Sequence, residues 1–385
     1  MVDPERLARR QGTDPSTLLR HFGSTAELLP LWIAEPNLPL APAVTGALRS
    51  RAADDWYGYE TRPESVIEAF WEWMAARHGW AGSGLHTIVS PSVGTSIGVL
   101  IDQFTEPGDG VIIQPPVFTD FKPLVTAGGR NPVRNPLMTT EDGYRIDFDR
   151  LAALASDPAT RLLILCSPHN PVGRVWTGDE LARVALICAE HDVFVLADEI
   201  HADLALPPHG FVPFATVATG VRWAATHGPI KTFGLAGVCD TLVVTADAEV
   251  VDRFGSRSSQ FHLTRNNVFG MAAFEAGYRH GESWLEGLLG TISRNIDVLR
   301  QRLPEQIRLV EPQGTYLAWL DLRSLGLDVP EIPRWLASEA GLALSPGHWF
   351  GRQGAGFARM TIASPTEVIE RAVDQLAAAV ERRRA

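Results

Sequence analysis

Cysteine is scarce in this chain: only Cys166, Cys188 and Cys239 occur among 385 residues. They lie far apart and form no C-x-x-C pair, which argues against a zinc cage and against a disulfide framework. The histidines show no H-x-x-x-H spacing of the kind that places two metal ligands on one helix face. The sequence therefore gives no support for metal chemistry.

Long apolar runs are also missing. No stretch approaches the roughly 20 residues that a bilayer span needs, and the N-terminal segment lacks the basic-then-apolar order of a signal peptide. The net charge of −11 disfavours wholesale binding to nucleic acid or anionic membrane, although a local basic patch is compatible with it. We therefore expect a cytoplasmic protein that has neither nucleic acid nor membrane as a partner.

The hydrophobic pattern from residue 86 onward is typical of an α/β protein. Amphipathic segments at 95–106 and 177–191 alternate with short runs that are apolar throughout, and Thr177 with Glu180 predicts a capping box for the second helix. Apolar strands separated by helices favour a mostly parallel sheet covered on both faces. The candidate strands are 86–91, 111–114, 161–167, 193–197 and 241–245.

The pattern changes after residue 280. Leucines and isoleucines between Leu285 and Leu303 mark one face of a long helix, and short strands follow before a final helix capped by Ser364. This predicts a second, smaller α+β domain that the N-terminal segment joins. The expected division is an N-terminal arm at 1–45, a large domain at 46–280 and a small C-terminal domain at 281–385.

Three segments carry the residues suited to chemistry: SPHNPVGRVW (167–176), ADEIHADL (197–204) and HGPIKTFGLAG (227–237). Each lies at or just past a strand end, on the sheet edge where open parallel sheets bind ligands. Taken singly, each also has an ordinary explanation as a tight turn, a solvated strand end or a surface lysine. Their order and spacing together are more specific.

With those segments the chain resembles the fold-type I pyridoxal 5′-phosphate (PLP) enzymes of the class I/II aminotransferase superfamily, and within it the MalY/PatB-type cystathionine β-lyase or C–S lyase branch. Further matching segments, including LPLWIAEPNLPLAPAV, QPPVF, GTYLAWLDLR and GFARMTIASP, extend the resemblance over nearly the whole chain after residue 28. The resemblance implies an aspartate-aminotransferase-like fold. It has a large PLP-binding domain with a mostly parallel, seven-stranded-type sheet, and a smaller domain built from both chain ends.

The resemblance also implies roles for individual residues. Lys231 would bind PLP covalently and then move the substrate Cα proton. Asp198 would keep the cofactor ring nitrogen protonated. Asn170 would donate a hydrogen bond to the cofactor's phenolate oxygen, with His201 as a second group nearby. His201 has the alternative of a structural histidine at a helix start.

Further residues would hold the cofactor phosphate, the ring and the substrate. Val93, Gly94 and Thr95 open an amphipathic run and would bind the phosphate at a helix N-terminus, and Phe118 would stack on the ring. In the family, a tyrosine at the position of Tyr59 serves the neighbouring subunit, which implies a homodimer with shared active sites. The expected substrate contacts come from the guanidinium fork of Arg359, from Ala34 and from Tyr59.

Several positions depart from the family pattern. Gly228 replaces a common serine, and Cys239 stands where many aminotransferases have an arginine that binds phosphate. His262 and Arg265 are candidates for reaching a polar substrate, with a solvated loop as the alternative. These departures favour a specialised substrate.

The expected activity is β-elimination from an L-cysteine S-conjugate, with thiol, pyruvate and ammonia as products. An aminotransferase, a decarboxylating oxidative deaminase of the same conjugates in natural-product biosynthesis and a non-catalytic PLP-binding regulator remain as alternatives.

Overall fold

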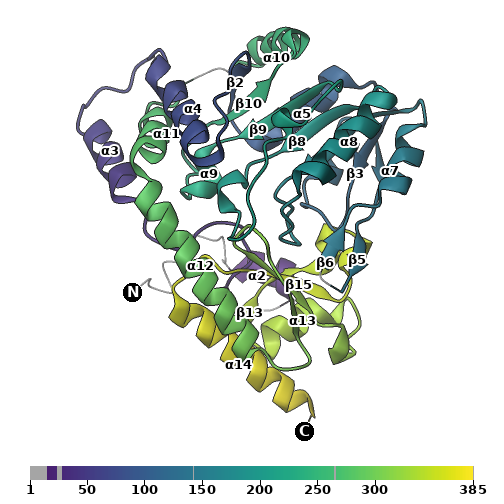
Figure 1. The fold of residues 1–385 in the computed structure, drawn as a ribbon. Helices are drawn as coiled ribbons and strands as arrows, with labels where there is room; N and C mark the ends of the chain where they lie inside the picture. The colour runs from purple at the N-terminus through teal and green to yellow at the C-terminus, as the bar shows by residue number, and fades with distance from the viewer. Residues whose placement is uncertain (1–14, 24–27, 142, 264–265, 385) are drawn as a thin grey trace.

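The computed structural model describes residues 15–23, 28–141, 143–263 and 266–384. A seven-stranded sheet forms the centre of the larger part of the molecule (Figure 1). The strand order is β2-β10-β9-β8-β7-β3-β4, and β10 runs antiparallel to both of its neighbours while the pairs from β9 to β4 are parallel. The strands are β2 (His86–Ser90), β3 (Gly110–Ile113), β4 (Asn131–Arg134), β7 (Thr160–Cys166), β8 (Phe194–Asp198), β9 (Trp223–His227) and β10 (Thr241–Thr245).

The sheet is buried because helices pack on both of its faces. Side chains of β3, β7 and β8 alternate between two hydrophobic clusters, one on each face, which explains why these strands are apolar throughout. The helices of this part are α3 (Pro42–Ala52), α4 (Glu64–His78), α5 (Val93–Phe104), α6 (Phe121–Ala127), α7 (Phe148–Ala155), α8 (Gly178–Glu190), α9 (Pro229–Thr232), α10 (Ala248–Gln260) and α11 (Val268–His280).

The five strands expected from the sequence are confirmed, with each boundary within one residue of its expected position. The capping box of α8 is also confirmed: Thr177 accepts a hydrogen bond from the Glu180 amide, and the Glu180 carboxylate accepts one from the Thr177 amide. Two strands of the sheet, β4 and β9, were not among the expected ones.

A four-stranded sheet of order β11-β12-β15-β14 lies in the second part of the molecule, below the large sheet in Figure 1. The long helix α12 packs against α14, and both cover this part. The strand β1, near the N-terminus, pairs in parallel with β13, so an N-terminal segment is part of this C-terminal region. The elements are α2 (Pro15–Phe22), β1 (Leu29–Pro30), α12 (Glu282–Arg302), β11 (Arg308–Val310), β12 (Leu317–Asp321), α13 (Glu331–Ser338), β13 (Leu342–Ala343), β14 (Ser345–Pro346), β15 (Phe357–Thr361) and α14 (Thr366–Arg384).

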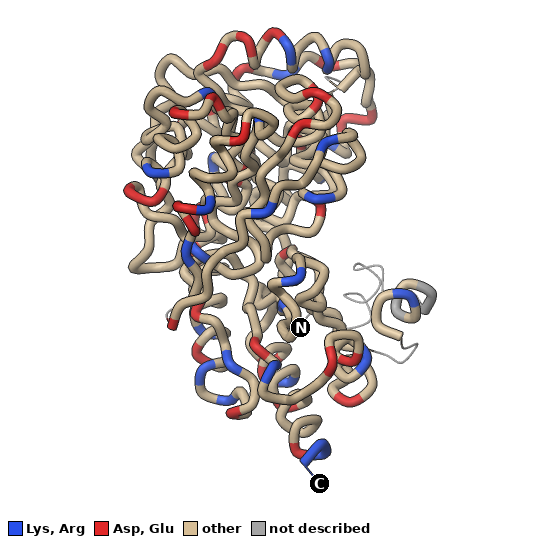
Figure 2. The backbone as a smooth tube through the Cα atoms, turned by 90° about the vertical axis from the view of Figure 1, so that its right-hand side faces the viewer, with Lys and Arg blue, Asp and Glu red and all other residues tan. Residues whose placement is uncertain are grey.

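A short hairpin of β5 (Met138–Thr140) and β6 (Gly143–Arg145) lies between the two parts in Figure 1. Cationic and acidic residues are interspersed over both parts of the molecule (Figure 2). None of the helices in the described ranges combines the length and the apolarity that a bilayer span requires. The domain boundaries at residues 45 and 280 remain predictions.

Candidate active site

The carboxyl ends of β7, β8 and β9 bring the three motif segments together. These strands are adjacent and parallel, and Asp198 at the end of β8 is paired with Cys166 on one side and Thr226 on the other. Each strand therefore ends at the same edge of the sheet. The segment after β9 turns sharply at Gly228, which has a φ of 153°, and then forms the one-turn helix α9 that carries Lys231. A Cβ at Gly228 would lie 3.2 Å from the Thr241 Cα, so both the positive φ and the close approach of the Thr241 backbone favour glycine here.

Lys231 is one of two lysines in the chain, and the other, Lys122, is exposed. The Lys231 Nζ donates a 2.8 Å hydrogen bond to the Ala34 carbonyl oxygen. Burial and, to a lesser extent, the nearby Arg359 cation lower the pKa of Lys231 to about 8, against the opposing charges of carboxylates that include Asp198. An amine with this pKa is neutral in about a tenth of molecules at pH 7, far more than an ordinary lysine, which suits it to accept a proton.

Asp198 is buried, with 3% of its surface exposed. Its Oδ1 accepts hydrogen bonds from the Thr226 hydroxyl at 2.9 Å and from the Ile200 amide at 3.4 Å. Burial raises the pKa of Asp198 to about 6, while those hydrogen bonds and the charge of Lys231 oppose the rise. A buried carboxylate in this position is stabilised by any cation that approaches it from the site.

Arg359 on β15 joins the second sheet to this edge of the first. Its Nη1 donates to the Asn170 Oδ1 at 3.0 Å, and its Nη2 donates to the Trp32 carbonyl oxygen at 2.6 Å and to the Ser345 hydroxyl at 3.2 Å. All three acceptors are neutral. Its guanidinium also lies over the Phe350 ring, 4.9 Å from the centroid. Burial lowers the pKa of Arg359 to about 10, so the group remains a cation at neutral pH.

Two buried nitrogen atoms at this site have no hydrogen-bond partner among the described residues: the Arg359 Nε and the His201 Nδ1. Burial keeps the pKa of His201 well below its ordinary value, and the charges of Lys231 and Arg359 act in the same direction, so the imidazole is neutral. Unpaired buried nitrogens are costly unless a ligand satisfies them. The site is therefore built for a polar ligand that the protein itself does not supply.

The N-terminus of α5 supplies a cluster of donors. The Ser92 side chain caps the helix by accepting from the Thr95 amide at 3.0 Å, and the Ser92 and Thr95 hydroxyls lie 2.9 Å apart. Val93 and Gly94 form the first turn, where backbone N–H groups lack partners within the helix. This arrangement suits an anion such as a phosphate group.

Phe118 lies in the segment after β3, where it is half-buried and packs edge-to-face against Phe121 with 5.6 Å between ring centroids.

Cys239 is buried, and its thiol donates to the Gly270 carbonyl oxygen at 3.3 Å. That contact turns the thiol toward the backbone of α11. The Cys239 thiol is therefore hydrogen-bonded to the backbone. It does not act as a ligand-facing substitute for the arginine that many aminotransferases have at this position.

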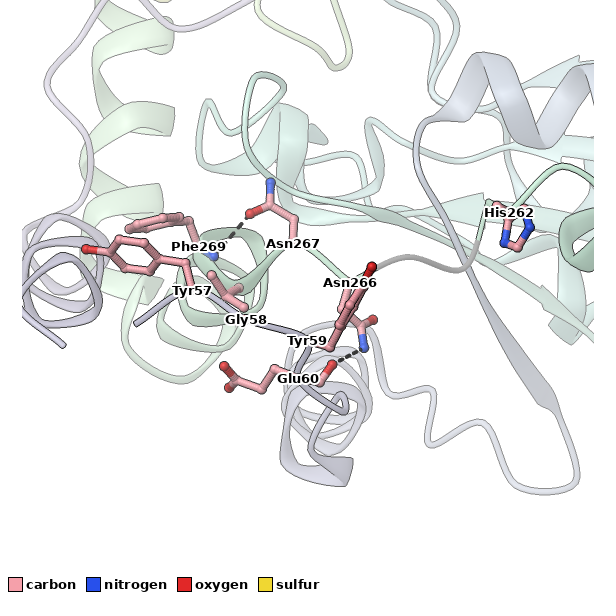
Figure 3. Close-up of a pocket in the computed structure, with 9 residues that line it drawn as sticks. Tyr57, Gly58, Tyr59, Glu60, His262, Asn266, Asn267 and Phe269 are labelled. Carbon is pink, nitrogen blue, oxygen red and sulfur yellow. Dashed lines mark hydrogen bonds between the residues drawn. The ribbon is translucent and has the colours of Figure 1, made fainter. Parts of the chain in front are cut away.

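Tyr59 is not brought to the Lys231 cluster within one chain. It is 88% exposed and lines a separate cavity of about 920 Å³, together with His262 and residues that begin α11 (Figure 3). The Asn266 side chain donates to the Glu60 carbonyl oxygen across this cavity at 2.8 Å. His262 faces the same cavity, whereas Arg265 lies outside the described residues. None of the described residues that line this cavity belongs to the Lys231 cluster. This placement agrees with a role for Tyr59 outside the site of its own chain.

The sequence analysis missed Tyr316 and Asp203. The Tyr316 hydroxyl donates to the Ala34 carbonyl oxygen at 3.1 Å, so this oxygen accepts from both Tyr316 and Lys231. Asp203 accepts from the Thr232 hydroxyl at 2.7 Å, directly beside Lys231 in the chain, and from the Trp73 indole at 2.8 Å. The matched segments GTYLAWLDLR and ADEIHADL contained both residues, but only their side-chain contacts reveal what they do.

A sheet edge that gathers a buried lysine, a buried carboxylate and a buried arginine is the arrangement expected of the fold-type I PLP enzymes. The chain belongs to the aminotransferase class I and II family, whose model matches residues 34–376. Cystathionine β-lyase PatB of Bacillus subtilis is 34% identical over 368 residues, which are 93% of this chain and 94% of that protein. Protein MalY of Escherichia coli is 30% identical, with 99% of each chain covered.

A solved structure shows the same overall fold. Cystalysin from Treponema denticola, which contains a PLP cofactor, superposes with a TM-score of 0.89 at 28% identity over 97% of each chain. The expected family, its PatB/MalY branch and the fold are therefore confirmed. The residues present here also fit PLP: a phosphate can bind at the α5 N-terminus, and Asp198 and the unpaired His201 Nδ1 offer partners to a ring that is both charged and polar.

Proposed function

We propose that this protein is a PLP-dependent C–S lyase that cleaves an L-cysteine S-conjugate to a thiol, pyruvate and ammonia. Lys231, Asp198, Asn170 and His201 would hold the cofactor, with Phe118 against its ring and residues 93–95 at its phosphate. When bound, PLP supplies an electron-accepting ring that stabilises negative charge at the substrate Cα. The PatB/MalY branch supports the lyase reaction.

One observation carries the proposal. Lys231 and Arg359 both donate hydrogen bonds to the same short segment, Lys231 to the Ala34 carbonyl oxygen and Arg359 to the Trp32 carbonyl oxygen. A proton-accepting amine and a carboxylate-binding guanidinium therefore lie on one wall of the site. An α-amino acid carries its carboxylate and its acidic proton on the same carbon atom, Cα, so an arginine and an amine on one wall can reach both groups of one substrate.

Each residue then has a defined task. Arg359 binds the substrate α-carboxylate and so fixes the direction of the Cα–H bond. The Lys231 Nζ accepts the Cα proton and keeps it away from solvent. Asp198 stays ionised at neutral pH and holds a proton on the cofactor's ring nitrogen. The Cβ–S bond breaks, its electron pair leaves with sulfur, and hydrolysis of the remaining three-carbon fragment yields pyruvate and ammonia.

We further propose that the enzyme is a homodimer in which Tyr59 reaches the cofactor phosphate of the partner subunit. The exposure of Tyr59 supports this, as does the cluster of exposed aromatic residues around it, since an aromatic patch of this kind is typical of an interface. The large exposed aromatic residues of this patch are Trp56, Tyr57 and Tyr59.

The experiment that tests the activity is product identification after incubation with a panel of S-alkyl and S-aryl cysteines. Equal amounts of pyruvate, ammonia and free thiol support the lyase. A 2-oxo acid that retains the sulfur substituent, with the amino group left on the cofactor, would instead indicate an aminotransferase. An aldehyde with carbon dioxide would indicate decarboxylating oxidative deamination. No turnover with any conjugate would favour a regulator.

A further inference from the structure

A second cavity, of about 350 Å³, borders the candidate active site. Its apolar wall includes Phe118, Phe350 and Trp349, and none of the residues that line it in the described chain is acidic. Its polar rim is basic. The rim residues with nitrogen-bearing side chains are Lys122, Arg134, His348 and Arg352.

The three permanent cations of this rim have no acidic partner. Among the described residues no carboxylate forms an ion pair with Lys122, Arg134 or Arg352, and all three side chains are exposed. About half of the other arginines in the described ranges form ion pairs; Arg222 and Arg300, for example, each bind two carboxylates. In a chain of net charge −11, three unpaired cations around one cavity form a local basic patch.

The cavity adjoins the residues assigned to the cofactor and the substrate. Phe350 lies beneath the Arg359 guanidinium at 4.9 Å, and its carbonyl oxygen accepts a 3.0 Å hydrogen bond from the Val117 amide. Phe118 follows directly in the chain. Gly351 lets the segment that contains Phe350 lie close to the segment after β3, because a Cβ at this residue would lie only 2.9 Å from the Pro115 Cβ.

We propose that this cavity binds the sulfur substituent of the substrate and that the preferred substituent has an aromatic body ending in a carboxylate. The inference rests on the proposed lyase function. Aromatic walls bury an apolar body, and unpaired cations at the rim attract a carboxylate at its end. Because the rim is exposed, the attraction is screened by salt and its effect is moderate.

The test compares S-benzyl-L-cysteine with S-(4-carboxybenzyl)-L-cysteine, which differ by one carboxylate. We expect kcat/KM for the acid to exceed that for the neutral conjugate about fivefold to tenfold at low ionic strength, and the ratio to fall as sodium chloride is added. The triple variant Lys122→Gln, Arg134→Gln, Arg352→Gln, which removes all three rim cations, should bring the ratio close to one and leave the rate with S-benzyl-L-cysteine unchanged. Arg145→Gln, at an exposed arginine on β6, is the matched control.

A binding measurement separates failure of this inference from failure of the proposed function. The α-methyl derivatives of both conjugates have no Cα proton and therefore bind without turnover, so calorimetry with the cofactor-loaded enzyme reads the cavity directly. Tighter binding of the acid, lost in the triple variant and kept in Arg145→Gln, supports the cavity even if neither conjugate is cleaved. Equal binding of the two derivatives, or a preference that survives the triple substitution, overturns the assignment whatever the activity.

Discussion

Asp198→Asn should stabilise the cofactor-free protein while it removes most of the activity. Burial raises the pKa of Asp198 from 3.8 to about 6, so the fold holds an ionised carboxylate at neutral pH at a cost. A rise of this size corresponds to roughly 3 kcal/mol, since each unit is about 1.4 kcal/mol. Asparagine is close in size and can still accept the hydrogen bonds of Thr226 and Ile200 without carrying the charge.

The sign of the pH dependence follows from the raised pKa. When Asp198 is protonated, the folded wild-type protein avoids the cost of the buried charge. It loses this contribution to the free energy of unfolding as the pH rises from about 4 to about 6, because the unfolded chain releases the proton first. Thermal unfolding of the cofactor-free proteins should therefore give Asp198→Asn a midpoint several degrees higher at pH 7.5, and the advantage should shrink toward pH 4. With PLP bound, kcat/KM should fall at least about a hundredfold, since the amide cannot hold the ring proton.

The matched control is Thr226→Val, which removes a hydrogen bond to Asp198 but leaves the carboxylate in place. It should lose stability at pH 7.5 and keep most of its activity. An Asp198→Asn protein that is less stable than the wild type at pH 7.5, or equally active, would refute the reasoning about this buried charge.

Three further predictions concern the other groups of the site. Arg359→Lys should raise KM for any cysteine conjugate and lower kcat/KM by about 10²-fold or more, because a point charge replaces a fork with two hydrogen-bonding nitrogens. Steady-state kinetics with S-benzyl-L-cysteine checks this, and a change in kcat/KM below about threefold would contradict it. Tyr59→Phe should weaken PLP retention about tenfold or more, measured by dialysis. Mixed dimers with Lys231→Ala should contain one site with wild-type affinity for PLP. Mixtures whose PLP affinity never exceeds that of the Tyr59→Phe parent would count against a shared site. Asp203→Asn should lower the unfolding midpoint, because three side chains donate to this buried carboxylate, and Thr232→Val should show a smaller loss of the same kind by calorimetry.

The central strands and the helices with clear caps could be predicted from the sequence. Strands such as β7 and β8 are apolar throughout, and α8 begins with a complete capping box, so local pattern and final structure agree. The β4 strand was missed because it is short, half-exposed and contains Pro132 at the sheet edge. The β9 strand was missed because its centre is Ala224 and Ala225, which have low strand propensity and owe their place to burial.

The candidate site divides in the same way. Lys231, Asp198 and Asn170 could be placed because strand ends of a parallel sheet converge on one edge. The double use of the Ala34 carbonyl oxygen by Lys231 and Tyr316 could not, because it depends on how the N-terminal segment packs against the second sheet. The basic cavity near Phe118 was equally hidden, since its rim residues come from segments more than 200 residues apart.

The measurement that tests the account most directly is pyruvate and thiol release from S-benzyl-L-cysteine by the wild-type protein, Lys231→Ala and Lys122→Ala. Because these two are the only lysines in the chain, the pair of variants assigns the essential amine without ambiguity. The account predicts equimolar pyruvate and thiol from the wild type, an unchanged rate with this neutral conjugate in Lys122→Ala, and no turnover above background in Lys231→Ala. Equal product release by Lys231→Ala and the wild type would contradict it.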